Sequence, residues 1–280
     1  MSAELPLFSI IIPTFNAGET IVDTLTSIVG QTFKNIEIII IDGLSSDSTI
    51  AIVSEFVKRD DRIIFKSEAD SGVYDAMNKG IVSSKGDWIL FCGADDRLYD
   101  QHVLEYVFET MDEVNAEFVY GDVIMDGDTQ WASKGTLYAG EFDIKKLLKQ
   151  NICHQAIFYK REIFDRLGYF DNNFKAAADW DFNLRCFAKE RVAYIKRTIA
   201  YYAAGGISDR TPDLAFLSVR IEKISKYFLN RLYRDVFIDE RYAIRKLVFS
   251  RDSEFNLIER LKISFAVVIL QGKSWMRRIF

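Results

Sequence analysis

The chain has 280 residues, of which 49% are hydrophobic and 28% charged, and its formal net charge is −5 at pH 7. This composition is typical of a globular protein, and the 3 Pro and 15 Gly argue against linkers or low-complexity tracts. With 3 widely spaced Cys and only 2 His, neither a disulfide framework nor a Cys/His zinc cluster is expected. A bound metal would therefore be held mainly by carboxylates, which favours Mg or Mn. The cysteine pattern and an N-terminus without signal-peptide features favour a cytoplasmic location.

The first third of the chain alternates short apolar runs with amphipathic stretches. The runs are typical of strands buried on both faces of a sheet, and they occupy residues 8–13, 36–41, 62–66 and 88–92. The amphipathic stretches between them are predicted helices at residues 19–29, 48–58 and 73–83. This alternation predicts an α/β fold with a mostly parallel, doubly wound sheet.

The remainder of the chain is less regular and ends in a helical segment. Strands are predicted at residues 118–125, 153–159 and 192–203, and helices at 178–190, 214–232, 240–249 and 254–270. We place a boundary near Asp209, so that residues 210–280 form a C-terminal helical extension. Residues 217–280 contain 14 Lys and Arg against 7 Asp and Glu, a net charge of +7 beside an acidic body.

Carboxylates follow three of the four predicted parallel strands. The strand ends are Pro13-Thr14-Phe15-Asn16, Asp42-Gly43, Asp70-Ser71-Gly72 and Gly93-Ala94-Asp95-Asp96. Asp and Gly are ordinary turn residues, so any one end is explained by a turn. Because ligands of doubly wound sheets bind at the carboxyl ends of the strands, the set together favours a cation or ribose site.

The same motifs carry a resemblance to a known family. The segments Ser9-Ile-Ile-Ile-Pro-Thr-Phe-Asn16 and Ile41-Asp-Gly-Leu-Ser-Ser-Asp-Ser-Thr49 resemble the opening of family 2 glycosyltransferases of the GT-A fold. Asp70-Ser-Gly-Val-Tyr-Asp-Ala-Met-Asn-Lys-Gly80 and Gly86-Asp-Trp-Ile-Leu-Phe-Cys-Gly-Ala-Asp-Asp96 extend it, and the former is similar to bacterial polysaccharide enzymes of the colanic-acid type. The resemblance covers about the first three quarters of the chain.

The resemblance implies a GT-A catalytic domain over residues 1–209, with nucleotide-sugar binding in 1–97 and the acceptor and catalytic part in 98–209. The implied activity is inverting transfer of a hexose or N-acetylhexosamine from a nucleotide-diphosphate sugar, a UDP-sugar by preference. The implied acceptor is a hydroxyl of a glycan or lipid-linked saccharide in bacterial cell-surface polysaccharide synthesis. No nucleic-acid partner is expected.

The resemblance assigns donor-binding roles to Pro13, Thr14, Asn16, Asp42, Asp70, Lys79 and Asp95. An acceptor-only carboxylate such as Asp42 suits the imide N–H or ribose hydroxyls of a nucleoside. Two alternatives stay open at this point. Asn16 is also placed to cap a helix, and Lys79 lies four residues after Asp75, where a surface ion pair is expected.

The metal is assigned to Asp96, with Asp95 as the alternative ligand. Family 2 enzymes usually carry Asp-x-Asp at this point, but here Gly93 replaces the first carboxylate. A capped turn before Leu98 is the alternative explanation of the pair.

Ala178-Asp179-Trp180-Asp181-Phe182 resembles the segment that supplies the catalytic base. Asp181 lies one helical turn before Arg185 and can pair with it, whereas Asp179 has only Asn183 at that spacing, so Asp179 is the preferred base and Asp181 the alternative. An N-cap role explains Asp179 equally well without the resemblance.

His154, Gln155 and Trp180 are assigned to the acceptor side, as are Gly121 and Asp122. The segment Gly205-Gly206-Ile207-Ser208 resembles a mobile loop that closes over the donor, and an ordinary turn is the alternative.

Other functions are distinguishable in principle. A dinucleotide-binding oxidoreductase needs Gly-x-Gly-x-x-Gly after the first strand, and the chain has Pro13-Thr-Phe-Asn-Ala-Gly18 there. A sugar nucleotidyltransferase would carry a Gly-rich basic loop, which the sequence lacks. A non-catalytic nucleotide-sugar-binding subunit of a synthase complex is the remaining alternative.

The basic extension is expected to hold the enzyme at the inner face of the cytoplasmic membrane. An apolar stretch, 263–270, is followed by Lys273, Trp275, Arg277 and Arg278, as in interfacial helices. The longest apolar run, 265–270, is too short to cross a bilayer. The alternatives are a helical cap on the catalytic domain and a homodimer interface.

Overall fold

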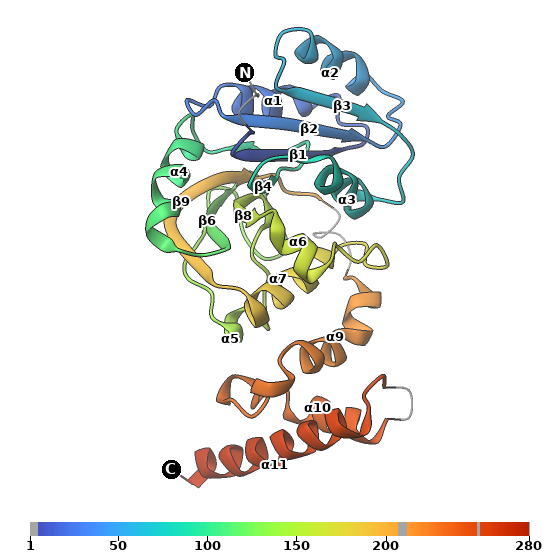
Figure 1. The fold of residues 1–280 in the computed structure, drawn as a ribbon, viewed down its shortest axis with the longest axis vertical. Coiled ribbons are helices and arrows are strands. Elements are labelled where there is room, and N and C mark those ends of the chain that lie inside the picture. The colour runs from blue at the N-terminus through green and yellow to red at the C-terminus, as the bar shows by residue number, and fades with distance from the viewer. Residues whose placement is uncertain (1–4, 207–211, 251–252, 280) are drawn as a thin grey trace.

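The computed structural model describes residues 5–206, 212–250 and 253–279. Its framework is a nine-stranded sheet with the strand order β3-β2-β1-β4-β8-β6-β9-β5, and β7 pairs with β6 beside this path (Figure 1). Helices cover both faces of the sheet, and a helical C-terminal segment lies at one end of the molecule.

The first four strands form the parallel part of the sheet. They are β1 (Phe8–Thr14), β2 (Ile36–Asp42), β3 (Ile63–Ser67) and β4 (Trp88–Phe91), and β1 pairs with β2 and β4 while β2 pairs with β3. Ile10 and Ile12 pack into one core cluster and Ile11 into the other, because alternate side chains of a strand point to opposite faces. Both faces are apolar, which is why these strands have continuous Ile runs.

The second half of the sheet is mixed. Strand β8 (Ile157–Lys160) is antiparallel to β4 and to β6 (Phe118–Met125), whereas β9 (Val192–Tyr202) is parallel to β6. The short strands β5 (Arg97–Leu98) and β7 (Leu137–Tyr138) add antiparallel pairs at β9 and β6. The parallel arrangement expected for most of the sheet is therefore confined to β1–β4 and the β6–β9 pair.

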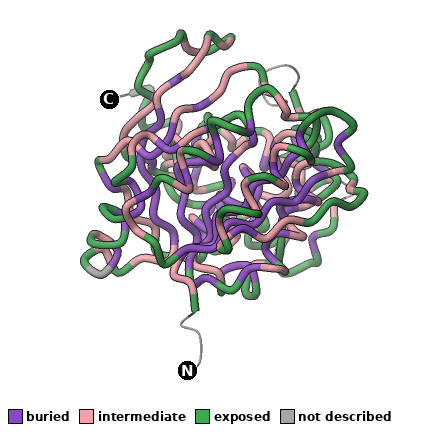
Figure 2. Tube along the Cα trace, turned by 90° about the horizontal axis from the view of Figure 1, so that it is seen from above, coloured by how far each residue is buried: buried purple, intermediate pink, exposed green. Residues whose placement is uncertain are grey.

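Two sets of helices cover the two faces. Helices α1 (Ile21–Val29), α2 (Thr49–Val57) and α4 (Val103–Val114) contribute to one core cluster. Helices α3 (Val73–Ser83) and α7 (Ala178–Lys189) contribute to the other. The remaining short helices of this part are α5 (Ile144–Leu147), η1 (His154–Ala156) and α6 (Glu162–Leu167). In Figure 2 the buried residues follow the strands through the centre, and exposed residues surround them.

The C-terminal segment contains α9 (Leu214–Tyr227), η2 (Leu229–Arg231), η3 (Asp235–Phe237), α10 (Arg241–Phe249) and α11 (Leu257–Ile279). Its buried side chains, such as Phe216, Ile244 and Leu270, belong to the core cluster that also contains Ile11 and Phe182. The helical extension is thus present, and its apolar core is continuous with that of the sheet. Among the described residues, no helix has both the length and the apolar composition that crossing a membrane requires.

Candidate active site

A cleft of about 860 Å³ opens at the carboxyl ends of β1 and β4. This volume lies in the range of small-molecule sites, roughly 300–1,000 Å³. Its lining includes the following predicted site residues: Pro13, Thr14, Asn16, Asp70, Asp95, Asp96, His154, Gln155 and Asp179. Residues more than 160 positions apart in the chain therefore meet in one cavity, as expected for strand ends at one edge of a sheet.

Asp42 lies outside the lining of the cleft. It is fully buried, and its carboxylate accepts hydrogen bonds from the Ser45 backbone N–H at 3.0 Å and the Ser67 hydroxyl at 2.7 Å, and from the Ser45 hydroxyl. The Ser45 Oγ in turn accepts the backbone N–H of Asn16 at 2.8 Å. In this structure Asp42 holds the loop after β2 against the end of β1.

Asn16 itself completes that loop. Its φ of 47° is left-handed, a conformation that Asn tolerates better than most residues. Its side-chain Oδ1 accepts the backbone N–H of Ser46 at 2.9 Å. The side chain thus ties two strand-end loops together while the residue still borders the cleft.

Lys79 and Trp180 also lie outside the cleft lining. The Lys79 Nζ donates to the Ala69 carbonyl at 2.5 Å and is 3.5 Å from the Asp75 carboxylate, so the predicted ion pair is present. The Trp180 Nε1 donates to the Leu147 carbonyl at 2.8 Å, and the ring packs against Phe216. The donor-sugar binding predicted for Lys79 and the acceptor-side role predicted for Trp180 stay predictions, and these contacts do not favour them.

Asp95 and Asp96 occupy the floor of the cleft with different environments. Asp96 is buried and accepts backbone N–H bonds from Gly93 at 3.1 Å and Ala203 at 2.9 Å, whereas Asp95 is exposed. Burial and the neighbouring Asp95 charge raise the pKa of Asp96 to about 6. A cation would relieve this charge, so the carboxylate pair fits a Mg or Mn ion.

The number of side chains that could act as metal ligands here is small, however. Among the residues that the structure describes, no group of three or more His, Cys, Asp or Glu side chains is arranged to hold a metal. An ion here would take its remaining oxygen ligands from a bound diphosphate and water, which is the coordination that Mg usually has in proteins.

Gly93, which stands where Asp-x-Asp has its first carboxylate, lies close to the side chains of Asp95 and Asp96. A Cβ at Gly93 would lie 2.7 Å from Asp96 Oδ2 and 2.8 Å from Asp95 Oδ1. The two carboxylates fold back over the glycine, so a side chain at this position requires both to move.

Asp179 is held in the cleft by neutral hydrogen-bond donors. Its carboxylate accepts the Tyr74 hydroxyl at 2.8 Å and the Asn151 Nδ2 at 2.9 Å, and His154 Nδ1 lies 3.8 Å away. Asn151 Oδ1 accepts in turn from Asn183 Nδ2 at 2.8 Å. This buried chain of donors fixes the orientation of the carboxylate without a Lys or Arg partner.

Asp181 has the opposite environment. It is 1% exposed and lies outside the cleft lining. Its carboxylate is 3.2 Å from Arg185 and 3.6 Å from Lys223, and it accepts the Tyr227 hydroxyl at 2.8 Å. The predicted pairing with Arg185 is present, and Asp181 joins α7 to α9.

His154 and Gln155, which belong to the short helix η1, also line the cleft. Burial lowers the pKa of His154, but the carboxylates of Asp179, Asp96 and Asp95 outweigh burial and raise it above its usual value. Gln155 is 1% exposed, and its Oε1 has no hydrogen-bond partner within the described ranges. A buried, unpaired acceptor in a cleft wall is well placed to bind a hydroxyl or amide of a ligand.

Several residues that line the cleft or contact Asp179 were not predicted from the sequence. Tyr74 lies within the quoted 70–80 motif but carried no assigned role, and its contact with Asp179 spans 105 residues. Asn151 and Lys175 had no local signal. Lys175 lines the cleft with its Nζ 3.4 Å from the Ser71 carbonyl, and it is the one Lys or Arg of the cleft lining within the described residues.

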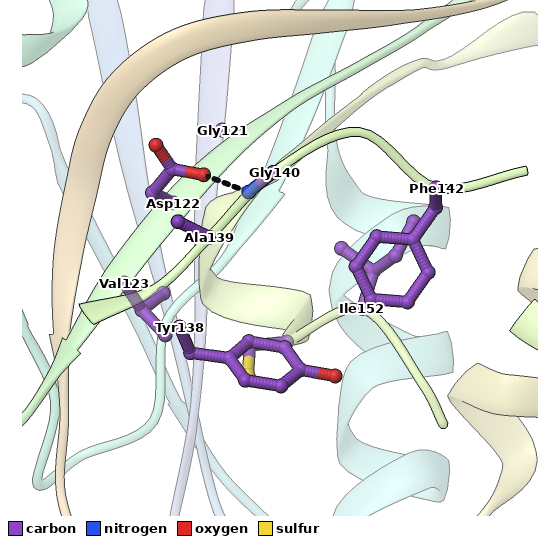
Figure 3. Close-up of a pocket in the computed structure, with 9 residues that line it drawn as sticks. Gly121, Asp122, Val123, Tyr138, Ala139, Gly140, Phe142 and Ile152 are labelled. Carbon is purple, nitrogen blue, oxygen red and sulfur yellow. Dashed lines mark hydrogen bonds between the residues drawn. The ribbon is translucent and has the colours of Figure 1, made fainter. Parts of the chain in front are cut away.

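The predicted Gly121-Asp122 site lies in a separate cavity of about 10 Å³ (Figure 3). Asp122 accepts the Gly140 backbone N–H at 2.9 Å and the Tyr194 hydroxyl at 3.0 Å. This cavity holds one water at most. Gly205 and Gly206 line the main cleft, while Ile207 and Ser208 of the predicted closing loop lie outside the described residues.

Comparison with known proteins identifies relatives for this architecture. The family model "Glycosyl transferase family 2" matches residues 9–168. A PGL/p-HBAD biosynthesis glycosyltransferase of Mycobacterium bovis (strain BCG / Pasteur 1173P2) is 41% identical over 218 residues, which cover 76% of this chain and 83% of that protein. An uncharacterized glycosyltransferase of Mycobacterium tuberculosis (strain CDC 1551 / Oshkosh) is 30% identical over 223 residues, covering 77% and 82%.

Two solved structures share the fold. S. aureus TarS 1-349 in complex with UDP-GlcNAc matches with a TM-score of 0.67 at 20% identity, over 93% of this chain and 79% of that chain. The mannosyltransferase PcManGT of Pyrobaculum calidifontis, in complex with GDP-Man and Mn²⁺, matches with a TM-score of 0.56 at 16% identity, over 99% and 82%.

Proposed function

This chain belongs to glycosyl transferase family 2, and from that premise we propose that it transfers a sugar from a nucleotide-diphosphate donor to an acceptor hydroxyl with inversion at the anomeric carbon. It is a glycosyltransferase with the GT-A fold, so the nucleotidyltransferase and non-catalytic alternatives are set aside. The observation that carries the mechanism is the carboxylate of Asp179, oriented by Tyr74 and Asn151 in the cleft that also contains Asp95 and Asp96.

Asp179 is the proposed catalytic base. It accepts the proton of the acceptor hydroxyl as that oxygen forms a bond to the anomeric carbon, and the bond from this carbon to the diphosphate breaks. Tyr74 and Asn151 keep the carboxylate pointing into the cleft without neutralising its charge. Asp181 is already engaged with Arg185 and Lys223, which makes it the weaker candidate.

Asp96, with Asp95 beside it, is the proposed site for a divalent Mg or Mn ion. When bound, such an ion stabilises the negative charge that develops on the leaving diphosphate. The structural neighbours named above have UDP-GlcNAc and GDP-Man bound, the latter with Mn²⁺, which supports a nucleotide-diphosphate sugar as donor. We prefer a UDP-sugar, placed along Pro13, Thr14, Asn16 and Asp70.

The acceptor is proposed to be a hydroxyl of a glycan or a lipid-linked saccharide in bacterial cell-surface polysaccharide synthesis. His154 and Gln155 provide polar atoms on the cleft wall beside Asp179, where an acceptor or the donor sugar would lie.

A two-step assay tests this function. UDP- and GDP-sugars are screened by thermal shift with and without Mn or Mg, and a true donor should raise the melting temperature only when the metal is present. The linkage made with the identified donor is then analysed by NMR. Retained anomeric configuration would overturn the single displacement, and metal-independent donor binding would overturn the metal site.

A further inference from the structure

Helix α11 has apolar side chains on two opposite faces, and the protein covers only one of them. The inner face, with Ile263, Val267 and Leu270, is buried in the core cluster. The other face carries side chains that are each between 50% and 74% exposed, and we call them the outer stripe: Leu257, Ile258, Leu261, Phe265, Val268, Trp275 and Met276.

The outer stripe follows the period of the helix. Leu257 and Leu261 are four residues apart, Phe265 follows after four more and Val268 after three, so these side chains lie along one side of α11. Helix α11 forms the end of the molecule farthest from β1–β3 (Figure 1). An exposed apolar row of this length on a globular protein is a sign of an interaction surface.

The C-terminal segment that carries this surface is rich in exposed cations. In the part of residues 217–280 whose burial is described, seven Lys and Arg are exposed against three acidic residues. The exposed cations are Lys226, Arg231, Arg234, Arg245, Lys246, Lys262 and Arg277. Lys262 directly follows Leu261 of the outer stripe, and its Nζ donates a hydrogen bond to Asn230 Oδ1 at 3.0 Å. The net charge of −5 of the whole chain thus arises outside this segment, whose own net charge is +7.

We propose that the outer stripe of α11 inserts into the surface of an anionic lipid membrane, with the helix axis lying along the membrane plane. Apolar residues with a Trp at the boundary and flanking Lys and Arg fit the interface between headgroups and acyl chains. Anionic headgroups would attract the positively charged C-terminal segment, whereas a second copy of this chain would bring a segment of the same positive charge. Charge complementarity therefore selects a membrane over self-association.

The membrane contact would also fix the orientation of the cleft. Helix α9 connects the extension to α7 through Tyr227 and Lys223, which both contact Asp181, two residues from Asp179. Because the extension is joined to α7 by these contacts, membrane binding would set the orientation of the cleft relative to the lipid surface. This inference does not depend on which sugar is transferred.

Vesicle co-sedimentation of the full chain tests the proposal. The stripe variant Leu261→Gln/Phe265→Gln/Val268→Gln replaces exposed side chains only. A matched control, Val22→Gln/Val82→Gln/Leu137→Gln, replaces exposed apolar side chains elsewhere. Each protein is mixed at low salt with vesicles of phosphatidylglycerol and phosphatidylcholine, or of phosphatidylcholine alone.

The wild type and the control should pellet with the anionic vesicles, and the stripe variant should bind them on the order of a hundredfold more weakly. A second variant, Arg245→Glu/Lys262→Glu, leaves the stripe intact and should weaken anionic binding about tenfold or more.

Circular dichroism checks that all variants are folded. Equal pelleting of the wild type and the stripe variant, or no pelleting of the wild type, overturns the proposal. A wild-type dimer that the stripe variant converts to a monomer, without vesicle binding, assigns the surface to a second copy instead. Donor binding measured by thermal shift on the same samples keeps this outcome separate from the proposed transfer reaction.

Discussion

At the scale of single residues, the two acidic side chains of α7 differ in the partners that surround them. Asp179 accepts hydrogen bonds from neutral donors inside the cleft, whereas Asp181 is buried between Arg185 and Lys223. The spacing to Arg185 was enough to predict the second case from the sequence. The donors to Asp179 come from Tyr74 and Asn151, which no local pattern links to it.

Asp179→Asn should keep donor affinity and lower turnover about a thousandfold, because the amide cannot accept the acceptor's proton. Donor affinity is followed by the metal-dependent thermal shift and turnover by release of the nucleoside diphosphate. Normal turnover in this variant, with a matching loss in Asp181→Asn, would transfer the role to Asp181.

Asp96→Asn should remove the metal-dependent rise in melting temperature on donor addition, because a neutral amide is a poor ligand for Mg or Mn. Asp95→Asn serves as the comparison and should weaken this rise less, since Asp95 is the exposed member of the pair. A donor shift that survives in Asp96→Asn would exclude Asp96 as the ligand.

In the metal-free protein, Asp96→Asn should instead increase the stability of the fold. Burial raises the pKa of Asp96 from 3.8 to about 6, so ionised Asp96 destabilises the fold by about 3 kcal/mol. The favourable protonated state is fully present only below the unfolded pKa and is lost as pH rises through about 6. Asp96→Asn should therefore be more stable than the wild type at high pH.

Urea denaturation in the presence of a chelator measures this difference. The gain should be largest near pH 8 and should shrink as the pH falls towards 5. Equal stabilities across this range would show that the Asp96 carboxylate is not strained by its burial.

At the scale of elements, the sequence pattern predicted the first half of the fold more closely than the second. The continuous apolar runs became β1, β2 and β4, because strands buried on both faces have an unmistakable composition. The two-residue strands β5 and β7 were missed, since their pairing depends on β9 and β6 and not on their own residues. The predicted helix over 214–232 ends at Tyr227, where η2 follows.

For the candidate site, too, the sequence pattern predicted some features and missed others. Strand-end residues such as Asp70 and Asp96 line the cleft, because the topology of the sheet brings strand ends together. Asp42 belongs to the same edge, but the hydroxyls of Ser45 and Ser67 turn its carboxylate inward. Side-chain direction at a strand end depends on such tertiary partners, which the sequence pattern does not encode.

The contact between α7 and α9 provides the prediction at this scale. Asp181→Asn leaves Arg185 and Lys223 without their buried counter-charge, so the free energy of unfolding should fall by about 3 kcal/mol. Tyr227→Phe is the matched control, because it removes one hydrogen bond to Asp181 and should cost about 1 kcal/mol. Urea titration of both variants decides, and an unchanged stability of Asp181→Asn would mean that α9 is not anchored through this ion pair.

At the scale of the whole molecule, the apolar core does not divide at the boundary predicted near Asp209, a residue that itself lies outside the described ranges. The apolar cluster that contains Ile11 of β1 and Phe182 of α7 continues to Phe216, Ile244 and Leu270. The extension therefore behaves as part of one folding unit, although its net charge differs in sign from that of the rest of the chain.

Ending the chain at Ser250 should destabilise the whole protein. The truncation removes Ile263, Ala266, Val267 and Leu270 from the core cluster, and it uncovers the apolar surface of α10 that they contact. Burial of these side chains contributes roughly 5 kcal/mol, so the melting temperature should fall for the catalytic part as well. Differential scanning calorimetry of the full chain should show one transition. A shortened chain that melts at the wild-type temperature would instead make α11 an independent appendage. For this reason side-chain changes on the outer stripe, which leave the inner face of α11 intact, separate membrane binding from folding better than truncation does.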